Sequence, residues 1–197
     1  MVKIAIFASG SGTNAQRITE YFLERNTCTI DLILSNNKDA YVLERARNMG
    51  ISAITFNRQE FYESSYIIDL LHEHSIEYII LAGFLWMVPD NLLMHYPGRI
   101  LNIHPALLPK YGGKGMFGMR VHEAIISNRE KESGITIHLV NERYDEGRIL
   151  FQAKCNIEET DTLFSLANKI HILEYRYFPL VIEHYILKGT PFRELSG

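Results

Sequence analysis

Short apolar runs alternate with amphipathic segments along the first half of the chain. The runs are continuous, which is typical of strands buried on both faces of a parallel sheet. The segments between them place apolar residues three or four positions apart, as helices do, and Gly50 is expected to end the second helix as a C-cap. This alternation predicts an α/β fold of three layers, α/β/α, with a mostly parallel sheet. The predicted strands are residues 3–8, 29–34, 51–56 and 78–82, and the predicted helices are residues 14–24, 40–49 and 60–74.

The second half of the chain is less regular. A period of two in residues 134–140 predicts a half-exposed strand that is antiparallel to its neighbour. In the last helix we expect Thr160 or Asp161 as the cap and a kink or interruption at Pro179. The predicted elements are strands at residues 99–103, 134–140 and 149–155, a loop rich in glycine and proline at residues 105–118, and helices at residues 121–128 and 161–187.

Composition changes this picture little. Hydrophobic residues make up 47% of the chain and charged residues 22%, as in ordinary globular proteins. The net charge of -3 argues against non-specific nucleic-acid binding, which needs a basic surface. Cys28 and Cys155 lie outside any metal-ligand spacing, which fits a reducing cytosol. With no leader pattern, no membrane-length apolar segment and no repeat, we expect one cytoplasmic domain at residues 1–190, a tail at residues 191–197, small-molecule partners, and a monomer or homodimer.

A glycine loop joins the first predicted strand to the first helix. Gly10 and Gly12 let successive backbone N–H groups point at one anion, and Ser11, Thr13 and Asn14 add donors. The spacing also matches a loose dinucleotide fingerprint, but the second strand ends in amides instead of an acidic residue, which disfavours a nicotinamide cofactor. We interpret the loop as a phosphate site; the alternative is a tight turn with an ordinary helix cap.

Asn102 and His104 come at the carboxyl end of a predicted strand, where open α/β sheets bind their ligands. Strand alternation puts the two side chains on the same side. An amide donor and an imidazole facing one point form a plausible site for an oxyanion and for proton transfer. Taken alone, a histidine at a strand end that is merely hydrogen-bonded is the simpler interpretation.

A longer ordered pattern changes that interpretation, because the chain resembles the folate-dependent formyltransferase family over about residues 1–185. Its Rossmann-like, single-domain formyltransferase fold agrees with the predicted elements. The glycine loop, Leu81-Ala82-Gly83-Phe84 and Glu174 resemble the members that formylate glycinamide ribonucleotide in purine biosynthesis. The motifs shared with the wider family are Asn102-Ile103-His104-Pro105-Ala106-Leu107-Leu108-Pro109, His122-Glu123-Ala124, Gly134-Ile135-Thr136-Ile137-His138 and Tyr144-Asp145-Glu146-Gly147.

The resemblance implies formyl transfer from the co-substrate 10-formyltetrahydrofolate to an amine, with no metal. It implies that His104 is the general acid, that Asn102 is an oxyanion donor, and that Asp145 supports the histidine and a proton relay. A nearby carboxylate is expected to raise the pKa of the histidine. The alternative for Asp145 is an ordinary turn residue, since Asp-Glu-Gly is common turn chemistry.

The resemblance also implies binding residues. Gly10, Ser11, Gly12, Thr13, Asn14 and Glu174 would bind the phosphate-bearing acceptor, with a solvated helix face as the alternative for Glu174. Plain core packing is the alternative for the apolar part of the folate site. The residues expected to bind folate are Leu85, Trp86, Met87, Val88, Asn102, Asn141, Glu142, Arg143, Tyr144 and Asp145.

The chain departs from the family pattern in three places. Trp86 stands where many relatives carry arginine, and residues 62–65 lack an arginine that some relatives place near the folate tail. Residues 112–118 form a longer, glycine-rich segment that suggests a mobile flap, in which Lys114, with nearby Arg120, could meet an anion; a flexible surface loop is the alternative. His122 also matches the family and is expected near the nucleotide, and His138 is expected to be structural or supporting.

Three other functions stay open at this point. Methionyl-tRNA formylation and formyltetrahydrofolate hydrolysis are activities of relatives that usually carry a further domain, which this chain is not expected to have. A non-catalytic nucleotide-binding module is a hypothesis from another class, and the presence of Asn102, His104 and Asp145 argues against it.

Overall fold

The computed structural model describes residues 1–194, so part of the predicted tail, residues 195–197, lies outside the described residues. The described chain forms two compact units, residues 1–102 and residues 103–194. The sheet order is β3-β2-β1-β4-β5-β6-β7. Neighbouring strands are parallel from β3 to β5, and β6 pairs antiparallel with β7. The predicted mostly parallel α/β fold is therefore confirmed. Among the described residues, no helix is long and apolar enough to span a membrane.

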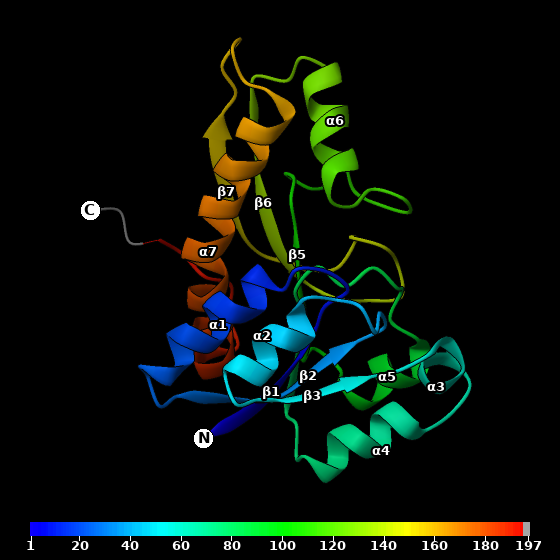
Figure 1. Ribbon diagram of the computed structural model, residues 1–197. Helices are drawn as coiled ribbons and strands as arrows, with labels where there is room; N and C mark the ends of the chain where they lie inside the picture. Colours follow the sequence, from blue (N-terminus) through cyan, green and yellow to red (C-terminus); the bar gives the residue numbers. More distant parts are fainter. Residues whose placement is uncertain (195–197) are drawn as a thin grey trace. The chain divides into compact units, whose positions relative to one another are not determined.

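The first unit is built on parallel strands whose apolar runs are almost completely buried. From Ile4 to Ala8 the side chains have no exposed surface, which explains why this run shows no polar alternation. Figure 1 shows α1 and α2 on one side of these strands and α4 on the other. The strands are β1 (Val2–Phe7), β2 (Cys28–Ser35), β3 (Ser52–Thr55), β4 (Tyr78–Leu81) and β5 (Ile100–His104), which crosses the boundary between the units.

The helices of the first unit correct two predictions. The single helix expected at residues 60–74 is two helices, because the hydroxyl of Ser64 bonds Glu60 O and accepts from Tyr66 N, which competes with the helical pattern. A further short helix, α5, was not predicted. The helices are α1 (Thr13–Leu23), α2 (Val42–Asn48), α3 (Arg58–Tyr62), α4 (Tyr66–Glu73) and α5 (Asp90–His95).

The second unit contains an antiparallel strand pair with the long helix α7 running along it (Figure 1). Residues Ser133 to His138 are all buried, so the expectation of a half-exposed strand is wrong: both faces of β6 are covered, and Thr136 satisfies its hydroxyl by donating to Ala106 O. The elements are α6 (Met119–Ser127), β6 (Glu132–Leu139), β7 (Ile149–Asn156) and α7 (Leu163–Lys188).

Helix α7 corrects the predicted cap and the predicted break. Its N-cap is Thr162, which forms a reciprocal capping box with Ser165. The helix continues through Pro179 without interruption. A proline removes one backbone hydrogen bond. Here Phe178, directly before the proline, and Val181, two positions after it, are fully buried, so packing holds the helix together.

Candidate functional site

The glycine loop, residues 8–15, presents an uncapped helix end. Gly12 is the N-cap of α1 with φ of 75°, and no side chain caps the helix or adds an acidic group to its first turn. A Cβ at Gly12 would clash with the Val42 side chain, so only glycine fits this approach of α2. The turn of the alternative interpretation is present, with a glycine and no side chain at the N-cap position, and the phosphate site stays a prediction. A helix end without a capping oxygen leaves its N–H groups for an anion.

Ser9 connects this loop to two other strand ends. Its hydroxyl donates to Asn36 Oδ1 at 2.6 Å and accepts from Leu85 N at 3.1 Å. The side chain of Asn37 donates to Ser9 O at 3.4 Å. Asn36 and Asn37, which follow β2, thus hold the glycine loop in place. A dinucleotide fingerprint would need an acidic residue at this position. Sequence reasoning missed Ser9, because a serine in a glycine-containing turn carries no distinctive signal.

Arg45 of α2 fixes the other side of the loop. Its Nε donates to Ser11 O at 2.8 Å, and its guanidinium also bonds the Gln16 side chain. The α2 backbone contributes too, since Val42 N donates to Gly10 O at 3.1 Å. A positive charge therefore lies directly on the predicted phosphate loop, in addition to the positive end of the helix dipole.

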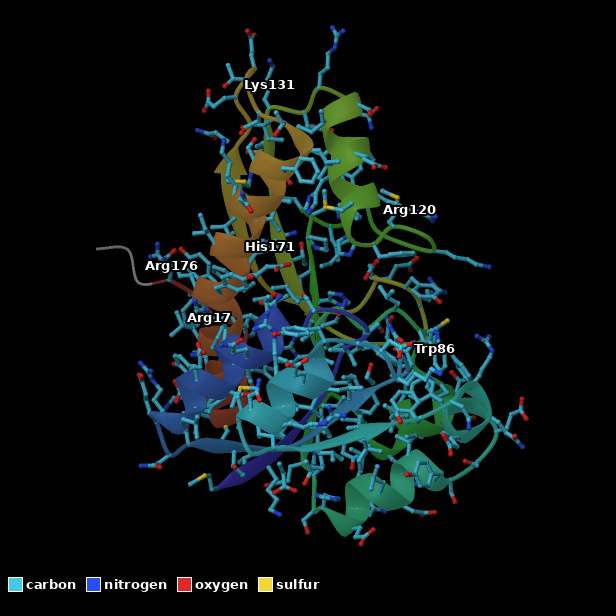
Figure 2. The ribbon with its side chains drawn as sticks, in the orientation of Figure 1. Arg17, Trp86, Arg120, Lys131, His171 and Arg176 are labelled. Atoms are coloured by element: carbon cyan, nitrogen blue, oxygen red, sulfur yellow. The ribbon has the colours of Figure 1, made fainter. Side chains whose placement is uncertain are left out.

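The segment expected to bind folate, residues 85–88, divides into exposed and buried parts. Leu85 is 47% exposed, whereas Val88 is 4% exposed and belongs to the core. Trp86 and Met87 are half-buried. Figure 2 shows Trp86 close to α3, where its ring contacts those of Phe61 and Tyr62. Core packing thus accounts for Val88, while the other three side chains keep surface for a ligand.

The second unit brings His104 and Asp145 together. Nδ1 of His104 lies 3.5 Å from Oδ2 of Asp145. Its Nε2 lies 2.7 Å from Tyr111 O. Because a carbonyl oxygen can only accept a hydrogen bond, Nε2 carries a proton and donates it to this bond. Asp145 has φ of 57°. This turn conformation directs its carboxylate to two histidines, because Oδ1 also lies 3.6 Å from Nε2 of His138. Asp145 is therefore a turn residue and a histidine partner at once.

The pKa of His104 reflects two opposing effects. Burial lowers it below its ordinary value and outweighs the Asp145 carboxylate, which raises it as expected. For Asp145 the neighbouring groups, and not burial, determine the direction in which the pKa shifts. Burial alone would raise its pKa, but His138, His104 and the N–H of Gly113 together lower it. The resting pair is a neutral imidazole facing a carboxylate.

His138 contributes more than the sequence suggested. It is 2% exposed, and Nδ1 lies 2.8 Å from Leu139 O, which leaves Nε2 directed at Asp145. The carboxylate also accepts from Gly113 N at 2.9 Å. The period of two in β6 was the available signal, since it places His138 and Thr136 on one face of the strand.

The remaining predicted residues are found in different environments. Glu174 is 7% exposed on α7, so the alternative of a solvated helix face is wrong. His122 is 3% exposed, and Nδ1 has no hydrogen-bond partner among residues 1–194. Burial, with His171 and His104, lowers the pKa of His122 to about 4. Asn141 is half-buried and accepts from Arg143 N. The exposed members are Lys114, Arg120, Glu142, Arg143 and Tyr144.

Asn102 is half-buried on β5, two positions before His104. Because side chains alternate along a strand, the two residues lie on the same side of it. The boundary between the two units falls directly after Asn102. The glycine loop, residues 85–88 and Asn102 belong to the first unit, and His104, His138, Asp145 and Glu174 belong to the second. Among the described residues, no cluster of three or more His, Cys, Asp or Glu side chains is arranged to hold a metal.

Comparison with known proteins gives the class. Residues 2–182 match the sequence profile of a family described as "Formyl transferase". The chain therefore belongs to the formyl transferase family, and it is a formyltransferase enzyme. Individual relatives agree with this family assignment. "Phosphoribosylglycinamide formyltransferase, chloroplastic" from Arabidopsis thaliana is 38% identical over 98% of this chain and 68% of its own length. The Bacillus subtilis phosphoribosylglycinamide formyltransferase is 35% identical over 94% of this chain and 95% of its own.

Solved structures agree with the sequence relatives. The phosphoribosylglycinamide formyltransferase of Streptococcus pneumoniae TIGR4 superposes with a TM-score of 0.83 at 36% identity, covering 94% of this chain and 99% of that one. Glycinamide ribonucleotide transformylase 1 of Symbiobacterium toebii gives 0.86 at 32% identity, covering 94% and 87%. The predicted formyltransferase fold is thereby confirmed.

Proposed function

We propose that this enzyme transfers the formyl group of 10-formyltetrahydrofolate to the amine of phosphoribosylglycinamide, a step of purine biosynthesis. The relatives carry that acceptor in their names. The chain itself supplies a phosphate-compatible glycine loop, with an uncapped helix end and Arg45 beside it. The folate donor is supported by the exposed Leu85 and the half-buried Trp86 and Met87, which offer an apolar surface to a flat ring.

The reaction is an acyl transfer without a covalent enzyme intermediate. The acceptor nitrogen attacks the formyl carbon, the carbonyl oxygen becomes an oxyanion, and the bond from that carbon to N10 of the folate then breaks. One proton must leave the attacking nitrogen and one must reach N10. We assign oxyanion stabilisation to the Asn102 amide, a neutral donor that needs no change of protonation.

His104 remains the general acid in this proposal, and its proton comes from the attacking amine. Because its pKa is lowered, His104 is neutral at pH 7 and can take up that proton. The Asp145 carboxylate, 3.5 Å from Nδ1, stabilises the imidazolium while it exists. Burial then favours release of the proton to N10, which restores the neutral state. The His104–Asp145 pair is the single observation that carries the mechanism.

A steady-state assay tests the function. Wild-type enzyme with 10-formyltetrahydrofolate should formylate phosphoribosylglycinamide, and His104→Ala should lose at least about 10²-fold in kcat. His95→Ala, an exposed histidine on α5, is the control and should keep full activity. Formylation of methionyl-tRNA, or release of formate to water, with no turnover of the phosphoribosyl amine would refute the proposed acceptor.

Cellular location and domain organisation stay predictions. The Arabidopsis relative is described as chloroplastic, and the sequence favours the cytoplasm for this chain through its cysteine usage. We also propose small-molecule partners, because both substrates of the proposed reaction are small molecules, and a monomer or homodimer.

A further inference from the structure

Tyr111 begins a short backbone segment that holds both members of the His104–Asp145 pair. Its carbonyl oxygen accepts from Nε2 of His104 at 2.7 Å. Two residues later, Gly113 N donates to the Asp145 carboxylate at 2.9 Å. A Cβ at Gly112, between them, would lie 3.3 Å from Cβ of Asp145, so this backbone packs directly against the pair. A shift of the segment would therefore disturb both side chains at once.

The backbone of Tyr111 has an unfavourable conformation. Its φ is 58°, in the left-handed region, where a side chain crowds the neighbouring carbonyl group. A residue other than glycine keeps such a conformation only where the surrounding contacts fix it. The two residues that follow are glycines, whose backbone rotates freely and restrains Tyr111 little. The side chain of Tyr111 is the part that supplies such contacts.

The Tyr111 hydroxyl is held by two side chains from the connection between α6 and β6. It donates to Glu130 Oε1 at 2.9 Å and accepts from Asn128 Nδ2 at 3.1 Å. Lys110 donates to the same Glu130 oxygen at 2.9 Å. Lys110 and the Tyr111 hydroxyl lower the pKa of Glu130, so it stays an ionised acceptor. A hydrogen bond to a charged group is stronger than one between neutral groups, which makes this a firm anchor.

The carbonyl of Tyr111 decides which nitrogen of His104 carries the proton. While Nε2 donates to that carbonyl, Nδ1 is unprotonated, 3.5 Å from Asp145 Oδ2, and is able to take up a proton. If the carbonyl turned away, the tautomer with its proton on Nδ1 would be favoured, because that proton could bond the Asp145 carboxylate. In that tautomer Nδ1 has no lone pair left to accept a proton from the attacking amine.

We infer that Tyr111 is a positioning residue for His104: its hydroxyl, anchored on Glu130 and Asn128, holds the carbonyl that keeps the histidine proton on Nε2 and leaves Nδ1 to accept. Tyr111 touches neither substrate in this account, so its effect on the rate passes entirely through His104. The catalytic part of the inference rests on the proposed function, whereas the tautomer of His104 can be measured without any substrate.

Nitrogen NMR of the histidine-labelled enzyme tests the tautomer directly, since it separates a protonated from an unprotonated ring nitrogen. His104→Ala identifies the signals of that residue by their absence. At neutral pH wild type should show His104 with its proton on Nε2, and Tyr111→Phe should show a mixture of the two tautomers. Tyr96→Phe is the matched control and should keep the wild-type tautomer, because its hydroxyl donates to Ile76 O in the first unit.

Steady-state kinetics test the consequence. Tyr111→Phe should lower kcat about tenfold, as expected for loss of one hydrogen bond to a charged group. The KM values should change little, because Tyr111 acts only on the chemical step. Burial lowers the pKa of His104 and the bond to Tyr111 O opposes this effect, so a looser bond should move the acidic limb of the pH–rate profile to lower pH. Glu130→Gln, which keeps an accepting oxygen, should retain more of the rate than Glu130→Ala.

The outcomes separate the inference from the proposed function. An unchanged tautomer in Tyr111→Phe overturns the inference, even if kcat falls, because a general loss of structure would lower the rate in the same way. A mixed tautomer with an unchanged kcat overturns its catalytic part. If Tyr111→Phe does not fold, Glu130→Ala and Asn128→Ala test the same anchor with the same readouts. If the tautomer changes as expected but wild type does not formylate phosphoribosylglycinamide, the proposed function fails and the positioning of His104 stands.

Discussion

Nδ1 of His104 and Oδ2 of Asp145 lie 3.5 Å apart, with the opposite ring nitrogen of the histidine 2.7 Å from the Tyr111 carbonyl oxygen. Both ring nitrogens therefore have a defined neighbour, and the carboxylate faces the one that is unprotonated in the neutral state. Proton uptake at His104 creates a buried cation directly beside an anion. Substitution of either residue therefore tests the catalytic role proposed for the pair.

Asp145→Asn should lower kcat by about 10²-fold, because the amide keeps the shape but cannot stabilise the imidazolium. The carboxylate raises the pKa of His104 against the effect of burial. Its removal should lower that pKa further and move the acidic limb of the pH–rate profile to lower pH. A pH series of kcat measures both effects. Glu146→Gln, an exposed neighbour, is the control; an unchanged kcat in Asp145→Asn would contradict the mechanism.

Acid should destabilise the protein partly through His122. Its pKa is about 4 in the folded state and about 6.5 when unfolded. As pH falls from 6.5 towards 4, the unfolded chain takes up a proton that the folded protein does not, so stability falls. Between pH 7 and pH 4.5 this group should cost about 2–3 kcal/mol. Urea unfolding of His122→Asn should show that much less pH dependence, whereas exposed His72→Asn should match wild type.

Gly12→Ala should destabilise the glycine loop more than a comparable substitution elsewhere. Gly50 has φ of 70° and nothing within 4 Å of an added Cβ, so Gly50→Ala reports backbone strain alone, about 1–2 kcal/mol. At Gly12 the clash with Val42 adds overpacking of roughly 1–3 kcal/mol. Thermal or urea unfolding measures the difference. Val42→Ala should partly rescue Gly12→Ala, and equal losses at the two glycines would contradict this account.

Ser9→Ala should raise KM for both substrates several-fold. The hydroxyl joins the glycine loop to Asn36 and to the backbone at Leu85, so its loss frees the predicted phosphate loop and the predicted folate segment together. Separate titrations of acceptor and donor test this coupling. Ser127→Ala, which removes an exposed hydroxyl at the end of α6, should change neither KM. An effect on one substrate only would mean that Ser9 does not link the two segments.

Sequence patterns predicted the parallel strands well, because strands such as residues 3–8 are buried on both faces and their composition reports that directly. Three predictions failed, two where tertiary packing decides the outcome and one where a local hydrogen bond does. Packing around Phe178 and Val181 carries α7 through Pro179, coverage of both faces buries β6, and a serine hydroxyl divides the helix expected at residues 60–74.

In the candidate site, too, the sequence predicted some residues and missed others whose contacts depend on tertiary structure. Motifs and resemblance identified His104 and Asp145, which the structure places together. Periodicity could not reveal the roles of Ser9 and Arg45, since their hydrogen bonds join segments far apart in the chain. The net pKa direction of His104 was also out of reach, because it depends on how much burial opposes one carboxylate.

The hydrogen bond from Gly113 to the Asp145 carboxylate ties the glycine-rich segment at residues 112–118 to the charge of the site. This N–H helps to lower the pKa of Asp145. By thermodynamic reciprocity, deprotonation of Asp145 must favour the conformation of the segment that donates this bond, to the same extent in free energy. The backbone of one surface loop and the protonation of one buried carboxylate therefore behave as a single coupled equilibrium.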